Sequence, residues 1–175
     1  IQNNDKVGVA FFSNEVEKFI PPKKGKQHIL RIIRELIDFQ PAGHATDIGA
    51  TLEYFNNLVK KRSICFIIFD FLSMNYEQAL RVAARRHDLI GVNIIDPREE
   101  SLPDVGLIRA QDAESGEIRW VDTSSRRLRE EYAQWHQQHL DYFGRTFKKS
   151  GASVVNIRTN ESYVDALHQF FQQRS

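Results

Sequence analysis

Acidic residues follow two apolar segments of this sequence, at positions where they could bind a ligand. Asp70 comes directly after the apolar run 64–69, and Asp96 comes directly after the apolar run 89–95. A carboxylate at the end of a buried strand is costly to bury without a partner, and perturbed carboxylates are enriched at functional sites. Asp70 and Asp96 are therefore candidates for metal binding or for acid–base chemistry.

A polar loop, 43–47, contains three further candidates, which are His44, Thr46 and Asp47. Thr46 and Asp47 both stand just before the next helical pattern, and either side chain is a suitable N-cap for that helix. One cap is enough for one helix, so the other side chain is free to face a ligand. Ser13, which follows the first strand pattern, adds a hydroxyl group to the candidates.

The hydrophobic pattern predicts the elements that must position these residues. Strands are predicted at 6–12, 16–20, 64–69, 89–95 and 153–157, and an inserted hairpin at 106–111 and 117–121. Helices are predicted at 29–37, 48–59, 76–83, 128–147 and 163–171. We expect Pro21 and Pro22 to end the second strand, Lys60 to Arg62 to close the last turn of the second helix, and Asn75 to cap the third.

The order of these elements predicts an α/β fold. Strands that alternate with helices form a doubly wound, mostly parallel sheet with helices on both faces, and here an antiparallel hairpin comes first. The run 64–69 is apolar throughout, which is typical of a parallel strand buried on both faces. Ligands of such sheets bind at the carboxyl ends of the strands, so Ser13, Asp70 and Asp96 are expected at that edge, with the loop 44–47 facing it.

Length and composition limit the classes of protein. The chain has 175 residues and a formal net charge of +1, with 24 Lys+Arg against 23 Asp+Glu, so a general nucleic-acid binder is not expected. The longest apolar run is too short to span a membrane. The single cysteine, Cys65, has no partner for an internal disulfide and predicts a buried, reduced thiol in a cytoplasmic protein.

Other possible motifs are weak. The segment 21–26 lacks the spacing of a phosphate-binding loop, and no Gly-x-Gly-x-x-Gly motif follows a strand. His136 and His139 are three residues apart on a predicted helix, but no third metal ligand is evident, so packing is the better interpretation. Cys65 lies inside a predicted strand, where a nucleophilic role is not expected.

The order of several segments resembles a known family. The chain is similar to a von Willebrand factor A-type domain, and more closely to the C-terminal part of bacterial proteins in the domain-of-unknown-function fifty-eight family. The resemblance covers essentially the whole chain, 1–175, as a single domain. It is carried by the segments NDKVGVAFFS, IPPKKGKQHIL, TDIGATLEYF, FIIFDFL, DPREESLPDVGLIRAQDAESGE and RTNESYVDAL.

The resemblance implies a metal-ion-dependent adhesion site for Mg²⁺ or Mn²⁺. Thr46 matches the threonine of the second metal-binding loop of such domains, and Asp70 matches the aspartate of the third. The first loop, Asp-x-Ser-x-Ser, does not occur in these residues. The family pattern places it on a strand upstream of Ile1, so we expect this chain to lack the first central strand and to hold about half of the ion site.

Two functions are compatible with this sequence. The first is a protein-interaction module with a metal-ion-dependent adhesion-type site, in which Ser13, His44, Asp47 and Asp96 form the rim that contacts a partner. The resemblance implies that this partner is a MoxR-type AAA+ ATPase, acting in the assembly or maturation of other proteins. The alternative is a metal-dependent phosphohydrolase that uses Asp70 and Asp96, although no further catalytic group converges with them in the sequence.

Overall fold

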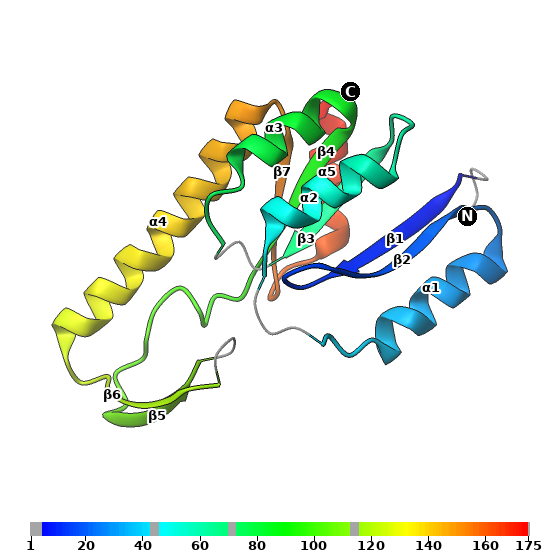
Figure 1. The fold of residues 1–175 in the computed structure, drawn as a ribbon. Helices are drawn as coiled ribbons and strands as arrows, with labels where there is room; N and C mark the ends of the chain where they lie inside the picture. The colour runs from blue at the N-terminus through cyan, green and yellow to red at the C-terminus, as the bar shows by residue number, and fades with distance from the viewer. Residues whose placement is uncertain (1–4, 43–45, 70–72, 113–115, 175) are drawn as a thin grey trace.

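The computed structural model describes residues 5–42, 46–69, 73–112 and 116–174 (Figure 1). Its strands are β1 (Val7–Phe12), β2 (Val16–Lys23), β3 (Ile64–Phe69), β4 (Asp88–Ile95), β5 (Leu107–Gln111), β6 (Ile118–Asp122) and β7 (Ser153–Arg158). Its helices are α1 (Lys26–Asp38), α2 (Ile48–Leu58), α3 (Glu77–Arg86), α4 (Arg126–Ser150) and α5 (Tyr163–Arg174). The predicted type and order of the elements are confirmed.

A parallel sheet in the order β3-β4-β7 forms the centre of the fold (Figure 1). Ile64 of β3 lies opposite Asp88 of β4, and Ile90 of β4 lies opposite Ser153 of β7. Parallel neighbours need a crossover connection, and α3 and α4 lie in the two connections between these strands. The predicted mixed α/β architecture with a parallel sheet is therefore confirmed.

One face of this sheet, which we call the covered face, packs against α2, α3 and α4. Ile67 of β3 and Leu89 of β4 join Leu80 of α3 and Phe147 of α4 in the main hydrophobic core. Gly91 of β4 allows α4 to come close, because a Cβ at this position would lie 2.6 Å from Cε1 of Phe147. The main core thus depends on an aromatic side chain filling the space that a glycine leaves open.

The opposite face of the sheet is only partly covered. The helix α5 packs on β4 and β7 through Leu167 and Phe170, which contact the buried residues Ile90, Val92 and Val155. This second core gives the sheet helices on both faces, as predicted.

The part of that opposite face that belongs to β3 is exposed, and we call it the open face. The relative exposure is 64% at Ile64, 46% at Phe66 and 56% at Ile68. The prediction that residues 64–69 are buried on both faces is therefore wrong. Phe171 of α5 reaches this side of β3, with its ring centroid 6.3 Å from that of Phe66, and β3 pairs with β4 alone among the described strands.

The N-terminal hairpin of β1 and β2 forms a separate two-stranded sheet. Its register pairs Val7 with Lys23, so β2 runs through Pro21 and Pro22. The prediction that these prolines end the strand is wrong, because proline is tolerated in an edge strand, where no N–H has to be donated outward. No strand of the described ranges connects this hairpin to the parallel sheet.

The helix α1 follows the hairpin and lies beside it (Figure 1). Nε2 of His28 lies 2.8 Å from the carbonyl oxygen of Val7, which ties the helix to β1. The predicted amphipathic pattern is present, but Leu30, Leu36 and Ile37 on its apolar side are exposed. The apolar side of α1 and the open face of β3 are therefore the two large uncovered apolar surfaces near the hairpin.

Two predicted helix ends differ from the structure. Tyr76, not Asn75, is the N-cap residue of α3, and no side chain caps that helix. Asn75 has a φ of 66°, and its backbone N–H instead donates to Oη of Tyr142 on α4, at 2.8 Å. Lys60 to Arg62 do not close α2, because the helix ends at Leu58.

Candidate functional site

Three connecting segments meet at the carboxyl ends of β1 and β3, and we call this meeting point the loop junction. The backbone N–H of Asp47, before α2, donates to the carbonyl oxygen of Ser13, after β1, at 3.1 Å. The hydroxyl of Ser73, after β3, donates to the carbonyl oxygen of Thr46 at 3.2 Å. The structure therefore brings Ser13, Thr46 and Asp47 together, as expected from the order of the strands.

Asp47 has a structural role at the start of α2. Its Oδ1 accepts a hydrogen bond of 2.9 Å from the backbone N–H of Ala50, and its carbonyl oxygen accepts one of 2.7 Å from the hydroxyl of Thr51. An N-cap of this kind satisfies a backbone donor that the helix itself leaves unpaired. The carboxylate of Asp47 is therefore engaged by the helix.

Thr46 is the residue that the helix does not use. Its carbonyl oxygen is held by Ser73, but its hydroxyl makes no hydrogen bond with any residue of the described ranges. The side chain is half-buried at the loop junction. The sequence left open which of the two residues caps α2, and the structure answers that Asp47 does.

Ser13 is buried rather than displayed. Its side-chain hydroxyl donates to Oδ1 of Asn14 at 2.9 Å, and its backbone N–H donates to the carbonyl oxygen of Glu15 at 2.9 Å. Its relative exposure is only 5%. Ser13 thus shapes the turn between β1 and β2 and holds Asp47 through its carbonyl group.

Asp96 lies at the end of β4 but belongs to a different turn. Its Oδ1 accepts a hydrogen bond of 2.9 Å from the backbone N–H of Arg98, and its carbonyl oxygen accepts one from the N–H of Glu99. Within the described ranges, no hydrogen bond or ion pair joins Asp96 to the loop junction. The other two predicted site residues, His44 and Asp70, lie outside the described residues.

Ser73 is the member of the loop junction that the sequence analysis missed. Its hydroxyl ties the segment after β3 to the residue before α2. A serine three residues after a strand-end aspartate is the available signal, but serines are common in such connections and this spacing alone predicts nothing.

The loop junction offers oxygen donors to a cation. The hydroxyl of Thr46 is an oxygen ligand of the kind that Mg²⁺ prefers. The residues described by the structure contain no group of three or more His, Cys, Asp or Glu side chains that could hold a metal ion. The hydroxyl oxygen at the loop junction is thus the type of ligand that a hard cation binds. The resemblance assigns one carboxylate ligand to the same site, that of Asp70.

The remaining sequence candidates have structural explanations. Nδ1 of His139 lies 2.8 Å from the carbonyl oxygen of Trp135, one turn earlier in α4, and the rings of Trp135 and His139 are 4.5 Å apart. This supports the interpretation of that histidine as a packing residue. Burial raises the pKa of the Cys65 thiol to about 11, which opposes formation of a nucleophilic thiolate.

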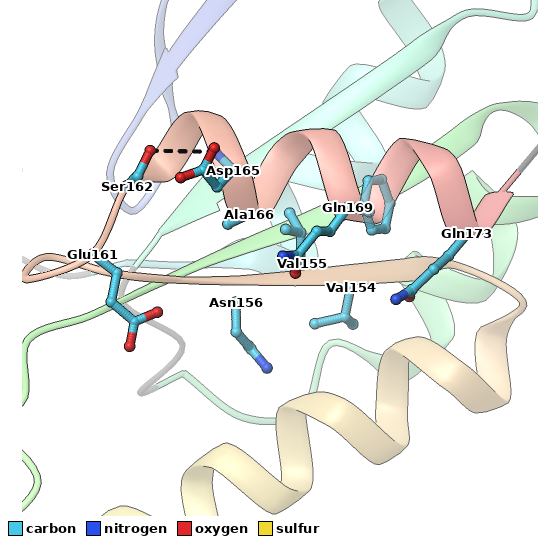
Figure 2. A pocket seen from close by; sticks show the side chains of 10 residues that line it. Val154, Val155, Asn156, Glu161, Ser162, Asp165, Ala166, Gln169 and Gln173 are labelled. Atoms are coloured by element: carbon cyan, nitrogen blue, oxygen red, sulfur yellow. Dashed lines mark hydrogen bonds between the residues drawn. The ribbon is translucent and has the colours of Figure 1, made fainter.

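A pocket of about 530 Å³ lies between α5 and β7, and no residue of the loop junction lines it (Figure 2). Its polar lining includes Glu161, Asp165 and Gln169, while Val154 and Asn156 project from the strand away from α5 (Figure 2). The backbone N–H of Asp165 donates to the hydroxyl of Ser162 at 3.4 Å, at the start of the helix. The pocket is open and has no set of converging catalytic groups.

Comparison with known proteins identifies related sequences of bacterial origin. A family model described as "Protein of unknown function DUF58" matches residues 1–142. Uncharacterized proteins of Mycobacterium tuberculosis and Mycobacterium bovis are 28% identical over 173 residues, which is 97% of this chain and 54% of theirs. The chain thus spans about half the length of these relatives. An uncharacterized protein of Mycobacterium avium is 27% identical over 89% of this chain and 93% of its own.

Two solved structures have a similar fold. One is the conserved hypothetical protein BatB from Bacteroides thetaiotaomicron, with a TM-score of 0.52 and 18% identity over 98% of this chain and 78% of that one. The other is an aerotolerance-related membrane protein from Bacteroides fragilis, with a TM-score of 0.53 and 16% identity over 97% of this chain and 78% of that one. In the described part of the present chain, no helix has the length and apolar character needed to cross a bilayer.

Proposed function

Because this chain belongs to the DUF58 family, we propose that it is a protein-interaction domain that binds its partner through a divalent cation at the loop junction. The observation that carries the proposal is the division of roles between two adjacent residues. Asp47 caps α2, and the hydroxyl of Thr46 is left without a partner among the described residues. A half-buried hydroxyl with no hydrogen bond to a described residue, next to a peptide group held from two sides, is suited to ligate a cation.

We assign the metal ligands to Thr46 and Asp70, and the cation to Mg²⁺ or Mn²⁺. Both ligands are oxygen donors, and Mg²⁺ in proteins is held by few carboxylates while it keeps several waters. The cation supplies positive charge that attracts a carboxylate of the partner. Thr46 orients the cation, since hydrogen bonds from Ser73 and to Ser13 hold the peptide group that joins Thr46 to Asp47.

The proposal includes a von Willebrand factor A-type arrangement in which a further strand lies against the free edge of β3. Two features support it. The edge of β3 opposite β4 is unpaired among the described strands, and the open face of Ile64, Phe66 and Ile68 is apolar and exposed. An added parallel strand would pair with the free backbone groups at this edge, and its crossover helix would cover the apolar surface.

The proposed partner is a protein with an exposed acidic side chain, and the resemblance makes a MoxR-type AAA+ ATPase the first choice. We propose that this interaction takes place in the cytoplasm, which agrees with the unpaired cysteine Cys65.

The proposal is tested by thermal unfolding of the full-length protein in Mn²⁺, in Mg²⁺ and in chelator. A ligand at a hundred times its dissociation constant adds about 2.7 kcal/mol to the free energy of unfolding. We expect this gain for the wild type and for Thr46→Ser, which keeps the hydroxyl. We expect it to be absent in Thr46→Val, which has nearly the same shape without the hydroxyl, and in Asp70→Ala.

Asp47→Asn is the matched control, because asparagine also caps helices well and leaves Thr46 in place. This variant keeps the metal-dependent gain if the roles are divided as proposed. Equal stabilisation of Thr46→Val and wild type by Mn²⁺ would contradict the proposed metal site.

A second experiment measures binding of a purified MoxR-type ATPase by interferometry. We expect this binding to require Mn²⁺ and Thr46, and binding that persists in chelator would contradict the proposed metal-dependent interaction.

A further inference from the structure

The hairpin of β5 and β6 has no buried residue in either strand, and the loop-junction proposal does not use it. It lies at the N-terminal end of α4 and extends away from the parallel sheet (Figure 1). The two strands pair with each other in an antiparallel ladder and with no other described strand. A two-stranded hairpin is only marginally stable alone in water, so its attachment to the domain matters.

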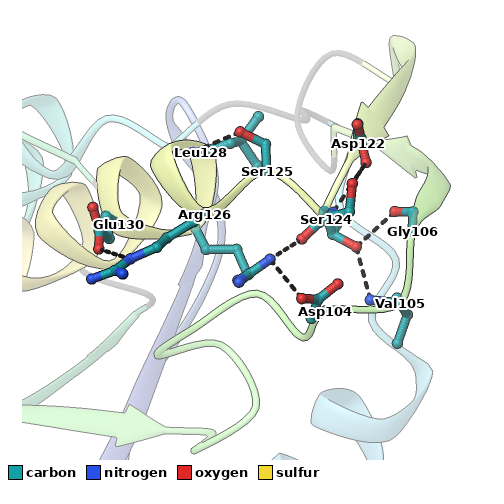
Figure 3. Close-up of polar contacts among 11 residues, drawn as sticks. Asp104, Val105, Gly106, Asp122, Ser124, Ser125, Arg126, Leu128 and Glu130 are labelled. Atoms are coloured by element: carbon teal, nitrogen blue, oxygen red, sulfur yellow. Dashed lines mark hydrogen bonds and ion pairs between the residues drawn. The ribbon is translucent and has the colours of Figure 1, made fainter.

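The buried residue Thr123 holds the base of this hairpin together. Figure 3 shows the polar contacts there, including those of Val105 and Gly106. The hydroxyl of Thr123 donates to the carbonyl oxygen of Gly106 at 2.7 Å and accepts from the N–H of Val105 at 3.1 Å. Nη1 of Arg129 on α4 donates to the carbonyl oxygen of Thr123 at 2.5 Å and forms an ion pair with Asp104 at 3.1 Å. The hairpin is therefore held firmly at its base.

One face of the hairpin, which we call the hairpin outer face, carries Leu107, Arg109, Gln111, Ile118, Trp120 and Asp122. The register places Arg109 directly opposite Trp120, and alternate residues of each strand share a face. All six side chains are exposed, and Trp120 has a relative exposure of 68%. The apolar residues of the other face, Ile108 and Val121 among them, are half-buried.

Arg109, at the centre of this face, has no charge partner among the described residues, and the acid on the same face, Asp122, accepts hydrogen bonds from Ser124 instead. Arg109 makes no ion pair or hydrogen bond with any described residue, whereas Arg119 on the other face is paired with Glu117 at 2.7 Å. Tryptophan and arginine are the residue types that most often dominate the binding energy of protein interfaces. A free cation between exposed apolar side chains calls for a carboxylate that is itself flanked by apolar groups.

We propose that the hairpin outer face is a docking surface for a partner protein, which presents an acidic side chain between apolar ones. Trp120 supplies the apolar anchor, Leu107 and Ile118 flank it, and Arg109 pairs with the acid. A membrane surface is the less suitable occupant, because residues 107–122 hold two arginines against four acidic residues, and this net negative charge disfavours anionic headgroups.

The test uses a phage-displayed library of random twelve-residue peptides, selected on the full-length protein and counter-selected on Trp120→Ala. We expect enriched peptides with an Asp or Glu flanked by apolar residues. Synthetic copies should bind the wild type at least tenfold more tightly than Trp120→Ala or Arg109→Glu. Replacing the peptide's acid with lysine should restore binding to Arg109→Glu, because the charges are then exchanged.

Trp135→Ala is the matched control, because it removes the other tryptophan of the chain, which is also exposed but lies on α4. It should bind the peptides as the wild type does. Leu107→Ser serves as a second, milder variant of the face, and circular dichroism checks that each variant is folded.

Three results overturn the proposal. One is a selection that yields no peptide able to distinguish wild type from Trp120→Ala, and another is unchanged binding by Arg109→Glu. The third is a different occupant, seen as Trp120-dependent binding to vesicles of phosphatidylcholine and phosphatidylglycerol, or as a Trp120-dependent dimer in sedimentation. Loss of the metal effect at Thr46 leaves this proposal standing, since the two surfaces share no residue.

Discussion

The two faces of β3 carry equally apolar side chains and have opposite surroundings. Ile67, on the covered face, has a relative exposure of 6% and lies in the main core with Leu80 and Phe147. Phe66 and Ile68, its neighbours in the chain, belong to the open face and are exposed. The difference shows that an apolar run indicates only that a strand can be buried. Whether each face is buried depends on the elements that pack against it.

The two faces of β3 also differ in their expected roles, one in stability and the other in interaction. Burial of apolar surface is the main stabilising contribution to folding, so the covered face should carry most of the stability. Exposed apolar surface of this kind marks sites where another protein segment binds. Four predictions test this division, in order of decreasing expected effect.

The first prediction compares two phenylalanines. Phe147→Ala removes a fully buried ring and should lower the free energy of unfolding by about 3–5 kcal/mol, since a large cavity is left in the core. Phe66→Ala, on the open face, should lower it by about 1 kcal/mol or less, because nearly half of that ring is already in water. Urea denaturation measures both, and equal losses would contradict the contrast between the faces.

The second prediction uses two glycines and expects effects of opposite sign. Gly91→Ala should destabilise by about 1–3 kcal/mol, because the added Cβ would lie 2.6 Å from a ring carbon of Phe147. Gly144→Ala, inside α4, should stabilise by up to about 1 kcal/mol, because the added Cβ meets no atom within 4 Å and alanine favours the helix. A stable Gly91→Ala variant would show that α4 is not closely packed on β4.

The third prediction concerns pH and the end of α3. His87 is buried, neither ring nitrogen has a hydrogen-bond partner among the described residues, and burial, with the nearby charge of Arg86, lowers its pKa below the ordinary 6.5. The unfolded chain binds a proton near pH 6.5 and the folded chain only at lower pH. Stability should therefore decrease as the pH falls below about 6.5, through the interval between the two pKa values.

Urea midpoints of wild type and His87→Leu between pH 8 and pH 5 measure this effect. The difference between the two proteins should be constant above pH 7, where the histidine is neutral in both states, and should change in favour of the variant at lower pH. Parallel curves across the whole range would mean that His87 is not kept neutral by its burial.

The fourth prediction has the smallest effect on stability. Ile68→Lys, on the open face, should change the free energy of unfolding by about 0.5 kcal/mol or less, as exposed substitutions usually do. It should reduce concentration-dependent self-association, because unpaired strand edges with apolar side chains pair with other chains. Sedimentation velocity over a range of concentrations measures this, and a wild-type chain that stays monomeric throughout would show that the free edge is already protected.

Much of the fold could be predicted from the sequence, because the relevant signals are local. The apolar runs predicted β3, β4 and β7, and the spacing of Ile29, Ile33 and Leu36 predicted α1. Pro21 and Pro22 were misjudged, since a proline is compatible with a strand when that strand lies at an edge, and edge position is not a local property.

The candidate site was predictable only in part. Strand ends and a capping position identified Ser13, Thr46 and Asp47, which the structure brings together. The same reasoning placed Asp96 with them, although its carboxylate is used by its own turn. Ser73 was missed, because its hydroxyl bonds to a carbonyl group far away in the sequence, and no pattern in the residues around Ser73 indicates such a bond.

The sequence by itself determined the type and order of the elements, since hydrophobic periodicity and backbone preferences act over a few residues. Only the tertiary structure decided which side of β3 is covered and that Asp47 rather than Thr46 caps α2. It also placed Arg109 across from Trp120 with no ion pair to any described residue. The physical reason is the same in each case. Burial, hydrogen bonding and charge pairing depend on atoms that are near in space, and segments far apart in the chain supply them.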